Sequence, residues 1–499
     1  MDRNKDEGTT PGAGELVARK YCGSCHSFPN PNLLDKQTWL KHTLPAMGYR
    51  FGIYNERHRD SLIEKGAAGK LITHLNIFPV QQTITDDDWA QIIGYYQKEA
   101  PEKLELPDTI SFTTESPFEV IIPNFNIERP AVSAVSFDKV TRKLYVADCS
   151  RENFSTVTLL DSSLKPVTSL GLPFPVSNLT ARNDTLYILM MGHFIPSDEP
   201  AGQLIKAIKN AKGEYEGYKM ILRGLRRPVD ADYADIDADD DDDIVICEFG
   251  NHTGSLSLFL KEGKHYRKQL LMEAPGAIEA IIDDLNNDSK LDIIALMAQG
   301  DEGIDVYYNE GMGKFRRERK LQFPPVYGSV SMILRDFNGD NFKDIIYVNG
   351  DNADASRIIK LYHGIRVFLN DQNDHFTESF FYSFPGAYKA VVEDVDGDND
   401  LDISAISFFP NFNSEPMKGF VHLENISKGD TLKFKPSLPD MPPGRWLTFT
   451  DLDINEDGRM DLLLGSFTSL DIPGDSSNVL KHKLQNESRP VILLKNHTK

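Results

Sequence analysis

The pattern of hydrophobic and polar positions changes once along the chain, close to residue 100. Before that point, apolar residues recur every three or four positions, which is the period of an amphipathic helix. Helices are predicted over 15–21, 38–44 and 58–75, and a last one between Thr85, its N-cap, and Pro101. The first part of the chain is therefore predicted to be a small all-α domain.

From about residue 121 onward, the pattern changes to short apolar runs separated by turn residues, which predicts β-strands. Five of these runs follow directly after an acidic segment with one formula: Asp or Asn at positions 1, 3 and 5, and Asp at position 9. The closing aspartates lie 49, 52, 58 and 59 residues apart. This internal repeat is typical of a β-propeller, in which each repeat forms one blade.

Two further apolar runs, Leu144–Cys149 and Leu186–Met191, lack an acidic segment and predict two more blades, which makes seven in all. The terminal run Val491–Leu494 is expected to share the closing blade with a strand from about 117–122. The predicted organisation is a flexible tail at 1–14, a helical domain at 15–103, a linker or edge strand at 104–120, and a seven-bladed propeller at 121–499.

The five acidic segments carry the ligand type that Ca²⁺ prefers, because a tight loop with alternate side chains turned inward supplies several oxygens to this hard ion. Up to five calcium sites are predicted. Weaker binding is expected in the first two loops, where Asp240 and Ser289 stand in place of a glycine that would ease the turn. The predicted ligands are Asp235, Asp237, Asp239 and Asp243; Asp284, Asn286, Asp288 and Asp292; Asp336, Asn338, Asp340 and Asp344; Asp394, Asp396, Asp398 and Asp402; and Asp453, Asn455, Asp457 and Asp461.

Residues 22–26 read Cys-Gly-Ser-Cys-His, the pattern used for covalent attachment of a c-type haem. Cys22 and Cys25 can form thioethers to the haem, and His26 is placed to ligate the iron. The alternative is a redox or zinc-binding C-x-x-C that happens to precede a histidine. No second C-x-x-C completes a zinc site, and no βαβ pattern surrounds this one.

A c-type haem iron commonly has a sixth ligand, usually a methionine thioether. Met47 is the only methionine between Cys25 and Pro101 and is the predicted ligand, with His42, His58 and His74 as alternatives. With both axial positions filled, the iron has no open position, which disfavours oxygen or nitrite chemistry at this haem.

Composition limits the partners. The chain has 54 Lys and Arg against 75 Asp and Glu, a formal charge of −21, which argues against nucleic acid and anionic membrane surfaces. No apolar stretch is long enough for a membrane helix. Cys149 and Cys247 end or lie in apolar runs and are expected to be free thiols rather than a disulfide.

These features together resemble bacterial proteins in which a small cytochrome c domain precedes FG-GAP (or VCBS) repeats. The resemblance rests on Tyr21–His26, Leu44–Gly48 and the five acidic loops. FG-GAP repeats elsewhere, as in integrin α-subunits, form seven-bladed propellers with calcium in their loops. The resemblance implies haem c and a periplasmic or cell-surface location. It also implies an export signal that this sequence lacks, and the polar start is compatible with a lipoprotein linker.

The favoured function is electron transfer, in which the haem domain passes single electrons and the propeller docks a redox partner protein or anchors a surface complex. A second hypothesis is a propeller oxidoreductase that uses the haem as its internal electron acceptor. A third is glycan binding or adhesion through long loops, such as Phe408–Phe412 and Asp351–Tyr362.

For the enzyme hypothesis, the repeat register places one residue of each acidic-loop blade in a ring around the central channel. Converging acid, base and hydroxyl groups there could bind a small polar ligand or transfer protons. A hydrated channel lining is the alternative. The ring residues are Asp230, Glu279, Ser331, Lys389 and Thr448, with Arg226, Arg227, Tyr388 and Trp446 expected near the same mouth.

Overall fold

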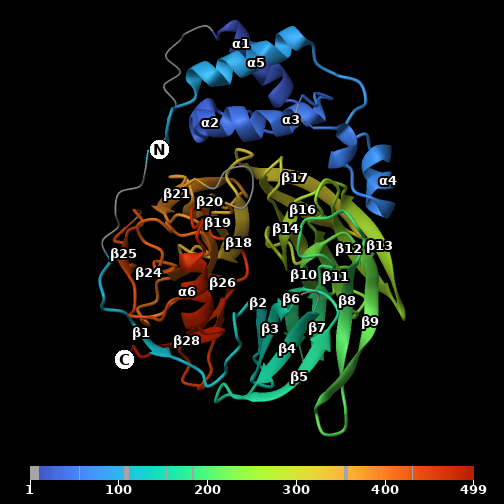
Figure 1. Cartoon of the computed structure of the whole chain (residues 1–499). Coiled ribbons are helices and arrows are strands. Elements are labelled where there is room, and N and C mark those ends of the chain that lie inside the picture. Colours follow the sequence, from blue (N-terminus) through green and yellow to red (C-terminus); the bar gives the residue numbers. More distant parts are fainter. Residues whose placement is uncertain are drawn as a thin grey trace.

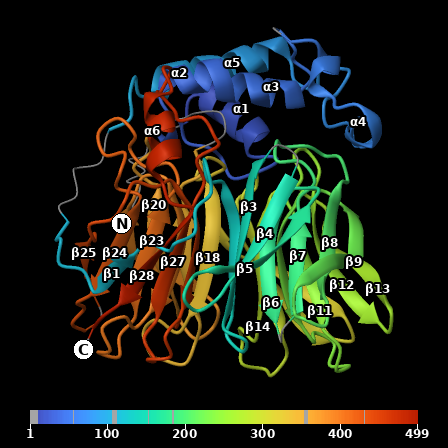
Figure 2. The same cartoon turned by 60° about the horizontal axis from the view of Figure 1, so that its bottom comes forward.

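The structure is a computed structural model that describes residues 11–55, 57–105, 112–151, 154–182, 185–352, 358–429 and 431–498. Most of the predicted tail, part of the predicted linker and part of the loop predicted at 351–362 lie outside the described residues. A group of helices lies across one end of a ring of β-sheets (Figures 1 and 2). No helix among the described residues is long and apolar enough to cross a membrane.

The helices occupy the part of the chain where helical periodicity predicts them. A predicted helix at 58–75 is divided, because the chain from Ile63 to Lys65 is extended and Gly66 takes a positive φ of 76°. The helices are α1 (Ala13–Cys22), α2 (Lys36–Thr38), α3 (Leu44–Arg50), α4 (Gly66–His74) and α5 (Asp86–Glu99), with a π-helical turn at Trp39–Thr43 and 3₁₀ turns at Pro31–Leu33 and Arg59–Leu62.

Helix α5 begins and ends where the sequence predicts. The Thr85 hydroxyl accepts a hydrogen bond from the Asp88 N–H at 3.1 Å, and three aspartates in the first turn face the positive end of the helix dipole. Its apolar face packs on α1 and on Trp39, whose ring centroid lies 4.4 Å from that of Tyr96. The helical part of the chain therefore has a core of its own.

The remainder is a seven-bladed β-propeller, as the repeat predicts. Each blade is a four-stranded antiparallel sheet, and the inner strands surround the centre (Figure 1). The first three blades are β2 (Val132–Asp138), β3 (Lys143–Arg151), β4 (Phe154–Leu160) and β5 (Pro166–Leu172); β6 (Val176–Arg182), β7 (Thr185–Met190), β8 (Gly202–Lys209) and β9 (Tyr215–Leu225); and β10 (Pro228–Ala234), β11 (Asp243–Glu248), β12 (Ser255–Glu262) and β13 (His265–Met272).

The next three blades follow in the same order along the chain. They are β14 (Ala277–Asp283), β15 (Asp292–Met297), β16 (Gly303–Gly311) and β17 (Lys314–Gln322); β18 (Ser329–Arg335), β19 (Asp344–Asn349), β20 (Gly364–Asn370) and β21 (Phe376–Ser383); and β22 (Ala387–Glu393), β23 (Asp402–Ser407), β24 (Phe420–Asn425) and β25 (Phe434–Ser437).

The last blade closes the ring with strands from both ends of the propeller segment. It comprises β26 (Trp446–Leu452), β27 (Asp461–Ser466), β28 (Val491–Asn496) and β1 (Phe118–Ile121), with α6 (Val479–Glu487) between β27 and β28. In this blade, Val120 pairs with Leu494. The predicted pairing of the terminal run with a strand near 117–122 is confirmed, and it removes the open edge that an unclosed ring would have.

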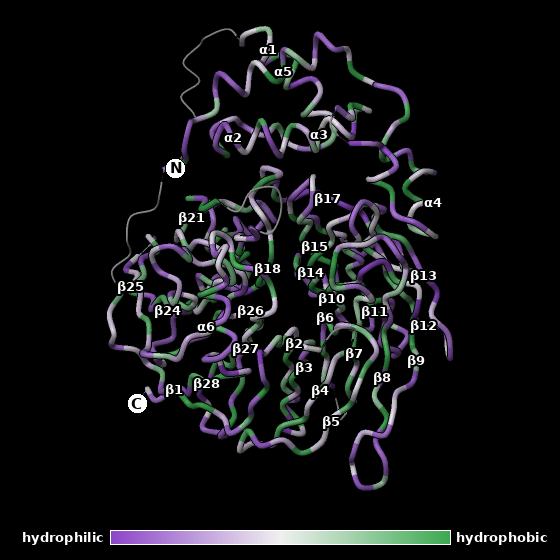
Figure 3. Tube along the Cα trace, in the orientation of Figure 1, coloured by the Kyte–Doolittle hydropathy of each residue, from purple (hydrophilic) through white to green (hydrophobic). Residues whose placement is uncertain are grey.

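The strand after each acidic loop is buried along its whole length, which explains why it reads as a continuous apolar run. Hydrophobic residues lie along the strands inside the blades, and hydrophilic residues gather in the connecting loops (Figure 3). The propeller core is therefore made by neighbouring blades packing face to face.

The two ends of the propeller carry different features. Because successive strands are antiparallel, the connections from first to second strand lie at one end, and those from second to third and from blade to blade lie at the other. The five acidic loops are connections of the first kind. The helices contact connections of the second kind, through Phe323, Tyr362 and His252. The helical domain and the acidic loops therefore lie at opposite ends.

Candidate functional site

The Cys-Gly-Ser-Cys-His motif begins at the last residue of α1 and continues in a turn. Cys22 is half-buried, Cys25 is exposed and His26 is half-buried. The His26 Nδ1 lies 2.8 Å from the carbonyl oxygen of Ser27, which can only accept, so Nδ1 carries the proton. The other ring nitrogen, Nε2, is therefore the one with a free lone pair for a metal.

Met47 belongs to the same apolar cluster as Cys22, together with Trp39 and Phe51. The cluster lies between α1, α3 and α5. The three histidines considered as alternatives, His42, His58 and His74, are all exposed. Among the candidates for a sixth ligand, Met47 is the one that shares a core with the attachment motif.

The zinc-binding or redox alternative for the two cysteines has less support. Burial raises the pKa of the Cys22 thiol to about 11, whereas redox-active cysteines have lowered pKa values. Over the residues that the structure describes, the groups of three or more metal-binding side chains are two acidic loops, and neither includes a cysteine. The four cysteines form no disulfide with one another.

The attachment motif also touches the propeller. The Ser27 hydroxyl donates to the carbonyl oxygen of Phe323, in the β17–β18 connection, at 2.9 Å. The Tyr362 hydroxyl lies 3.1 Å from the carbonyl of Leu33. Val326 and Ile358, both from propeller loops, pack against the apolar cluster that contains Cys22 and Met47. The propeller thus forms part of the surroundings of the motif.

Glu64 makes a second connection between the two parts. Its carboxylate accepts hydrogen bonds from the Ser197 hydroxyl at 2.6 Å and from the Asp198 N–H at 2.9 Å. Asp198 is itself buried and accepts hydrogen bonds from the backbone N–H groups of His252 and Thr253. This chain of bonds fixes α4 to the β7–β8 and β11–β12 connections.

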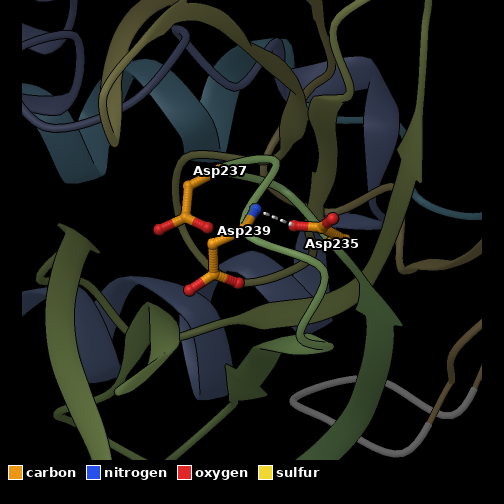
Figure 4. Close-up of side chains that lie close together, drawn as sticks. All are labelled: Asp235, Asp237 and Asp239. Carbon is orange, nitrogen blue, oxygen red and sulfur yellow. Dashed lines mark hydrogen bonds between the residues drawn. The ribbon is translucent and has the colours of Figure 1, made fainter. Parts of the chain in front are cut away.

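The five acidic loops share one hydrogen-bond framework. In the first, the Asp235 carboxylate accepts from the N–H of Asp239 at 3.0 Å (Figure 4). It also accepts from the N–H of Asp240 at 2.9 Å. The carboxylates of Asp235, Asp237 and Asp239 each have an oxygen within 4.8 Å of the others. The loop from Asp394 holds the same arrangement of three carboxylates.

The ninth residue of each loop has a structural role. Asp243 accepts from the N–H of Ile236 through one oxygen and from the N–H of Lys261, in the third strand, through the other. The equivalent aspartates are also buried, and each accepts from an asparagine N–H in the third strand of its own blade: Asp292 from Asn309, Asp344 from Asn370, Asp402 from Asn425, and Asp461 from Asn496. The ninth position therefore joins the acidic loop to the second and third strands of the blade.

The absence of glycine does not change the path of the first two loops. Asp240 and Ser289 have φ values of 67° and 68°, close to the 81° of Gly458 at the same position of the last loop. A left-handed conformation costs a non-glycine residue about 1 kcal/mol or more. The framework thus imposes one backbone conformation on all five loops.

The loops differ in the cations next to their carboxylates. Lys290 Nζ lies 3.1 Å from Asp288, and the Arg459 guanidinium lies 2.5 Å from Asp457, so these two loops hold an internal counterion. In contrast, one oxygen of Asp237 and one of Asp400 are buried without a hydrogen-bond partner. Asp400 was not among the predicted ligands, although its place in the acidic run was a signal.

The predicted channel ring occupies equivalent positions, directly after a β-bulge in each inner strand. Its carboxylates bridge successive blades. Asp230 accepts from the side chain of Asn178 at 2.9 Å and from the N–H of Ala280 at 3.1 Å, and Glu279 accepts from the N–H of Met332 at 2.6 Å. These contacts give both side chains a structural role.

Burial raises the pKa of both Asp230 and Glu279; the negative charge of Glu279 adds to the effect on Asp230, and the positive charge of Lys389 opposes both shifts. Ser331 hydrogen-bonds Glu279, whereas Thr448 is buried without a partner for its hydroxyl. The five polar residues therefore stand at equivalent positions of the inner strands, and the charges of Asp230, Glu279 and Lys389 act on one another.

The residues expected at the channel mouth have structural contacts of their own. Trp446 is buried in the core of the last blade. The Arg227 guanidinium lies over the ring of Phe249. Burial raises the pKa of Tyr388 well above its usual value, so its hydroxyl stays protonated near neutral pH. In the predicted binding loop at 408–412, Phe408 and Phe409 are buried against the guanidinium of Arg445.

A family model for the FG-GAP-like repeat matches residues 284–347, which run from the second acidic loop to the strand after the third. The chain contains an FG-GAP-like repeat. No curated protein matches the chain in sequence. Among solved structures, the Dos1 propeller is 10% identical over 73% of this chain and 76% of its own, with a TM-score of 0.43. A protein from Lactobacillus plantarum is 9% identical over 62% and 86%, with a TM-score of 0.41.

Proposed function

We propose that this protein is a haem c electron carrier of the periplasm or cell surface, in which the propeller is the rigid base of the haem domain and the docking surface for a redox partner. The observation that carries the proposal is the His26 tautomer, because the bond from Nδ1 to Ser27 leaves Nε2 to face a metal. FG-GAP-like repeats are typical of extracellular proteins, which agrees with the compartment where haem c is attached.

In this proposal, each residue around the motif has a distinct task. Cys22 and Cys25 hold the haem covalently, His26 ligates the iron, and Met47 supplies a thioether from the shared apolar cluster. A bound haem would supply a one-electron couple. Val326 and Ile358 of the propeller exclude water from one side of the cluster. Exclusion of water from a haem changes its reduction potential.

Calcium in the acidic loops would stiffen the end of the propeller away from the haem domain. The loops from Asp235 and Asp394 are the best candidates, because each brings three carboxylates together and holds a buried oxygen without a partner. The loops from Asp284 and Asp453 are weaker candidates, because Lys290 and Arg459 already neutralise one carboxylate. The loop from Asp336 has two carboxylates and an asparagine at its first, third and fifth positions. We expect its calcium affinity to be intermediate between those of the two groups.

The second candidate function is an oxidoreductase with its substrate in the propeller channel. Lys389 beside Asp230 and Glu279 favours it, since a buried pair of acids with a nearby cation is a common proton-transfer arrangement. The hydrogen bonds of both acids to neighbouring blades explain the same residues without a substrate. Electron transfer therefore ranks first.

A mediated redox titration of the haem-loaded full chain tests the proposed function. We expect one reversible one-electron transition, rapid exchange with a soluble redox protein or dye, and no oxygen consumption. A screen of sugars and alcohols tests the second candidate. Haem reduction by one compound, lost in Glu279→Gln or Lys389→Met and retained in Lys41→Gln, would reverse the ranking.

A further inference from the structure

Arg50 is a half-buried cation at the junction of the helical domain and the propeller. It lies at the end of α3, three residues after Met47. Its Nη2 donates to Nδ1 of His252, in the β11–β12 connection, at 3.0 Å, and its guanidinium lies over the ring of Phe78. Within the described part of the chain, no carboxylate oxygen comes within 4 Å of Arg50. Buried arginines usually form an ion pair with a carboxylate, and Arg50 has no such partner among the described residues.

Among the neighbouring charges, Asp198 opposes the effect of burial on the pKa of Arg50 most strongly, but its carboxylate is not bonded to the guanidinium. Burial lowers the pKa of Arg50, and the charges of Asp198 and of a Cys25 thiolate oppose that shift. The Asp198 oxygens are taken by hydrogen bonds from the backbone of Asn251, His252 and Thr253. The carboxylate therefore holds the loop in shape and leaves the guanidinium with donors to spare.

His252 accepts the hydrogen bond from Arg50 and so sets the direction of the guanidinium. Because an arginine N–H can only donate, Nδ1 of His252 accepts and the ring proton is on Nε2. Burial and the charge of Arg50 lower the pKa of His252, so the ring is neutral near pH 7, with Glu64 and Asp198 as the nearby negative charges that oppose the shift. Phe78 packs edge-on against the imidazole at 5.0 Å and fixes its orientation.

We propose that Arg50, oriented by His252, binds a carboxylate, and that this carboxylate is a propionate of the haem attached at Cys22 and Cys25. The inference rests on the proposed function for the source of the carboxylate. The Arg50 guanidinium has the planar fork of donors that matches a carboxylate. Its neighbours in the chain, Met47 and Phe51, belong to the apolar cluster that contains Cys22, which places Arg50 beside the attachment motif. Since His252 belongs to the propeller, haem attachment and domain docking would reinforce each other.

The first experiment measures the reduction potential of the haem-loaded full chain between pH 5 and pH 9. Arg50→Gln removes a positive charge that favours the reduced haem. We expect a fall equivalent to about tenfold in the reduction equilibrium, about 59 mV for one electron. The fall should diminish at low pH, where the unpaired propionate is protonated. Arg50→Lys should restore most of the potential, and His252→Gln should give a smaller fall.

Lys41→Gln is the matched control, because it removes one positive charge from an exposed position earlier in the same helical segment. Its potential should equal that of the wild type. An unchanged potential and pH profile in Arg50→Gln, with haem still attached, would overturn the inference and leave the proposed function intact.

The second experiment separates a haem propionate from a free carboxylate. Acetate and succinate are titrated into the full chain made without haem and into the haem-loaded chain, with the melting temperature as readout. We expect stabilisation of the haem-free wild type only, and none in Arg50→Gln. An Arg50-dependent response in the haem-loaded chain would assign the site to a free ligand instead. A chain that never acquires haem would refute the proposed function, while the haem-free titration still reports on carboxylate binding at Arg50.

Discussion

The Ser27 hydroxyl donates a hydrogen bond to the carbonyl oxygen of Phe323 across 2.9 Å, and so joins the residue after the Cys-Gly-Ser-Cys-His motif to a propeller loop 296 positions further along the chain. A helical domain joined to the propeller only by a flexible linker would not make this hydrogen bond. The propeller is therefore part of the surroundings of the motif, and substitutions in this propeller loop should change the structure or stability of the helical domain.

The Glu64 contacts predict how the two parts separate. Glu64→Ala leaves the Ser197 hydroxyl and the Asp198 N–H without an acceptor, which costs about 1–3 kcal/mol of docking free energy. Hydrogen exchange should increase in the β7–β8 and β11–β12 connections, while the blade strands stay protected. Glu99→Ala, at an exposed position of α5, is the control. Unchanged exchange in both connections would mean that Glu64 does not fix the helical domain.

Met47 should set the spectrum of the oxidised protein. If its thioether ligates the iron, Met47→Ala abolishes the long-wavelength absorption band that is diagnostic of a sulfur–iron(III) bond. Met312→Ala, almost fully exposed on the propeller, should leave that band unchanged. Survival of the band in Met47→Ala would exclude Met47 as the ligand, and loss of spectral features in His42, His58 or His74 variants would then identify its replacement.

Calcium should stabilise the propeller by mass action. At a free concentration one hundred times the dissociation constant, one site adds about 2.7 kcal/mol to the unfolding free energy. Chelation should lower the melting temperature, and Asp237→Asn and Asp396→Asn should reduce the calcium response more than Asp288→Asn does. A melt that is the same in excess chelator and in calcium would contradict structural calcium sites.

The left-handed conformation of Ser289 makes it a position for stabilisation. Ser289→Gly should raise the unfolding free energy by up to about 1 kcal/mol, because glycine adopts φ near 68° without steric strain. Gly458→Ala should lower it by a similar amount, since a Cβ there meets no other atom and the change is backbone strain alone. Chemical denaturation in chelator measures both. Equal stability of all three proteins would argue against a common loop conformation.

The channel acids predict a pH dependence of stability. Burial raises the pKa of Glu279 and Asp230 in the folded chain, so the folded state binds these protons more tightly than the unfolded state does. Stability from this source is complete below the unfolded pKa values and is lost as pH rises through the folded ones. Glu279→Gln should therefore be the more stable protein at pH 8, and this advantage should disappear near pH 4.

Urea denaturation of wild type and Glu279→Gln at pH 4 and pH 8 measures that difference. Gln can keep the hydrogen bond from the Met332 N–H, so the comparison isolates the charge. A larger loss of stability at pH 8 than at pH 4 in the variant would contradict buried, protonatable acids in the channel.

Local pattern was enough to predict the elements of the fold. The Asp-rich formula recurs in five blades and marks the start of a buried strand, and the apolar run at 491–494 lies between β27 and the strand near residue 118. Thr85 followed by three aspartates identifies the start of α5. Each of these signals is contained within about ten residues, which is the range over which sequence periodicity carries information.

The contacts between distant residues could not be predicted in this way. Glu64 meets Asp198, and Arg50 meets His252, across separations of more than one hundred residues with no periodic signal. The repeat predicted that the five polar residues occupy equivalent positions on the inner strands. It could not predict that Asp230 and Glu279 hydrogen-bond to the next blade, because this depends on the distance between neighbouring inner strands. The role of the ninth aspartate in joining strands likewise requires the third strand, which the loop formula does not include.

Covalent haem on the exported full chain is the most direct test of the account. The protein is isolated from cells competent for c-type haem attachment, denatured, extracted with acidified acetone, and measured as its pyridine haemochrome. We predict that haem stays with the wild-type chain and is absent from the Cys22→Ser, Cys25→Ser double variant. A wild-type chain that carries no covalent haem under these conditions would contradict the account.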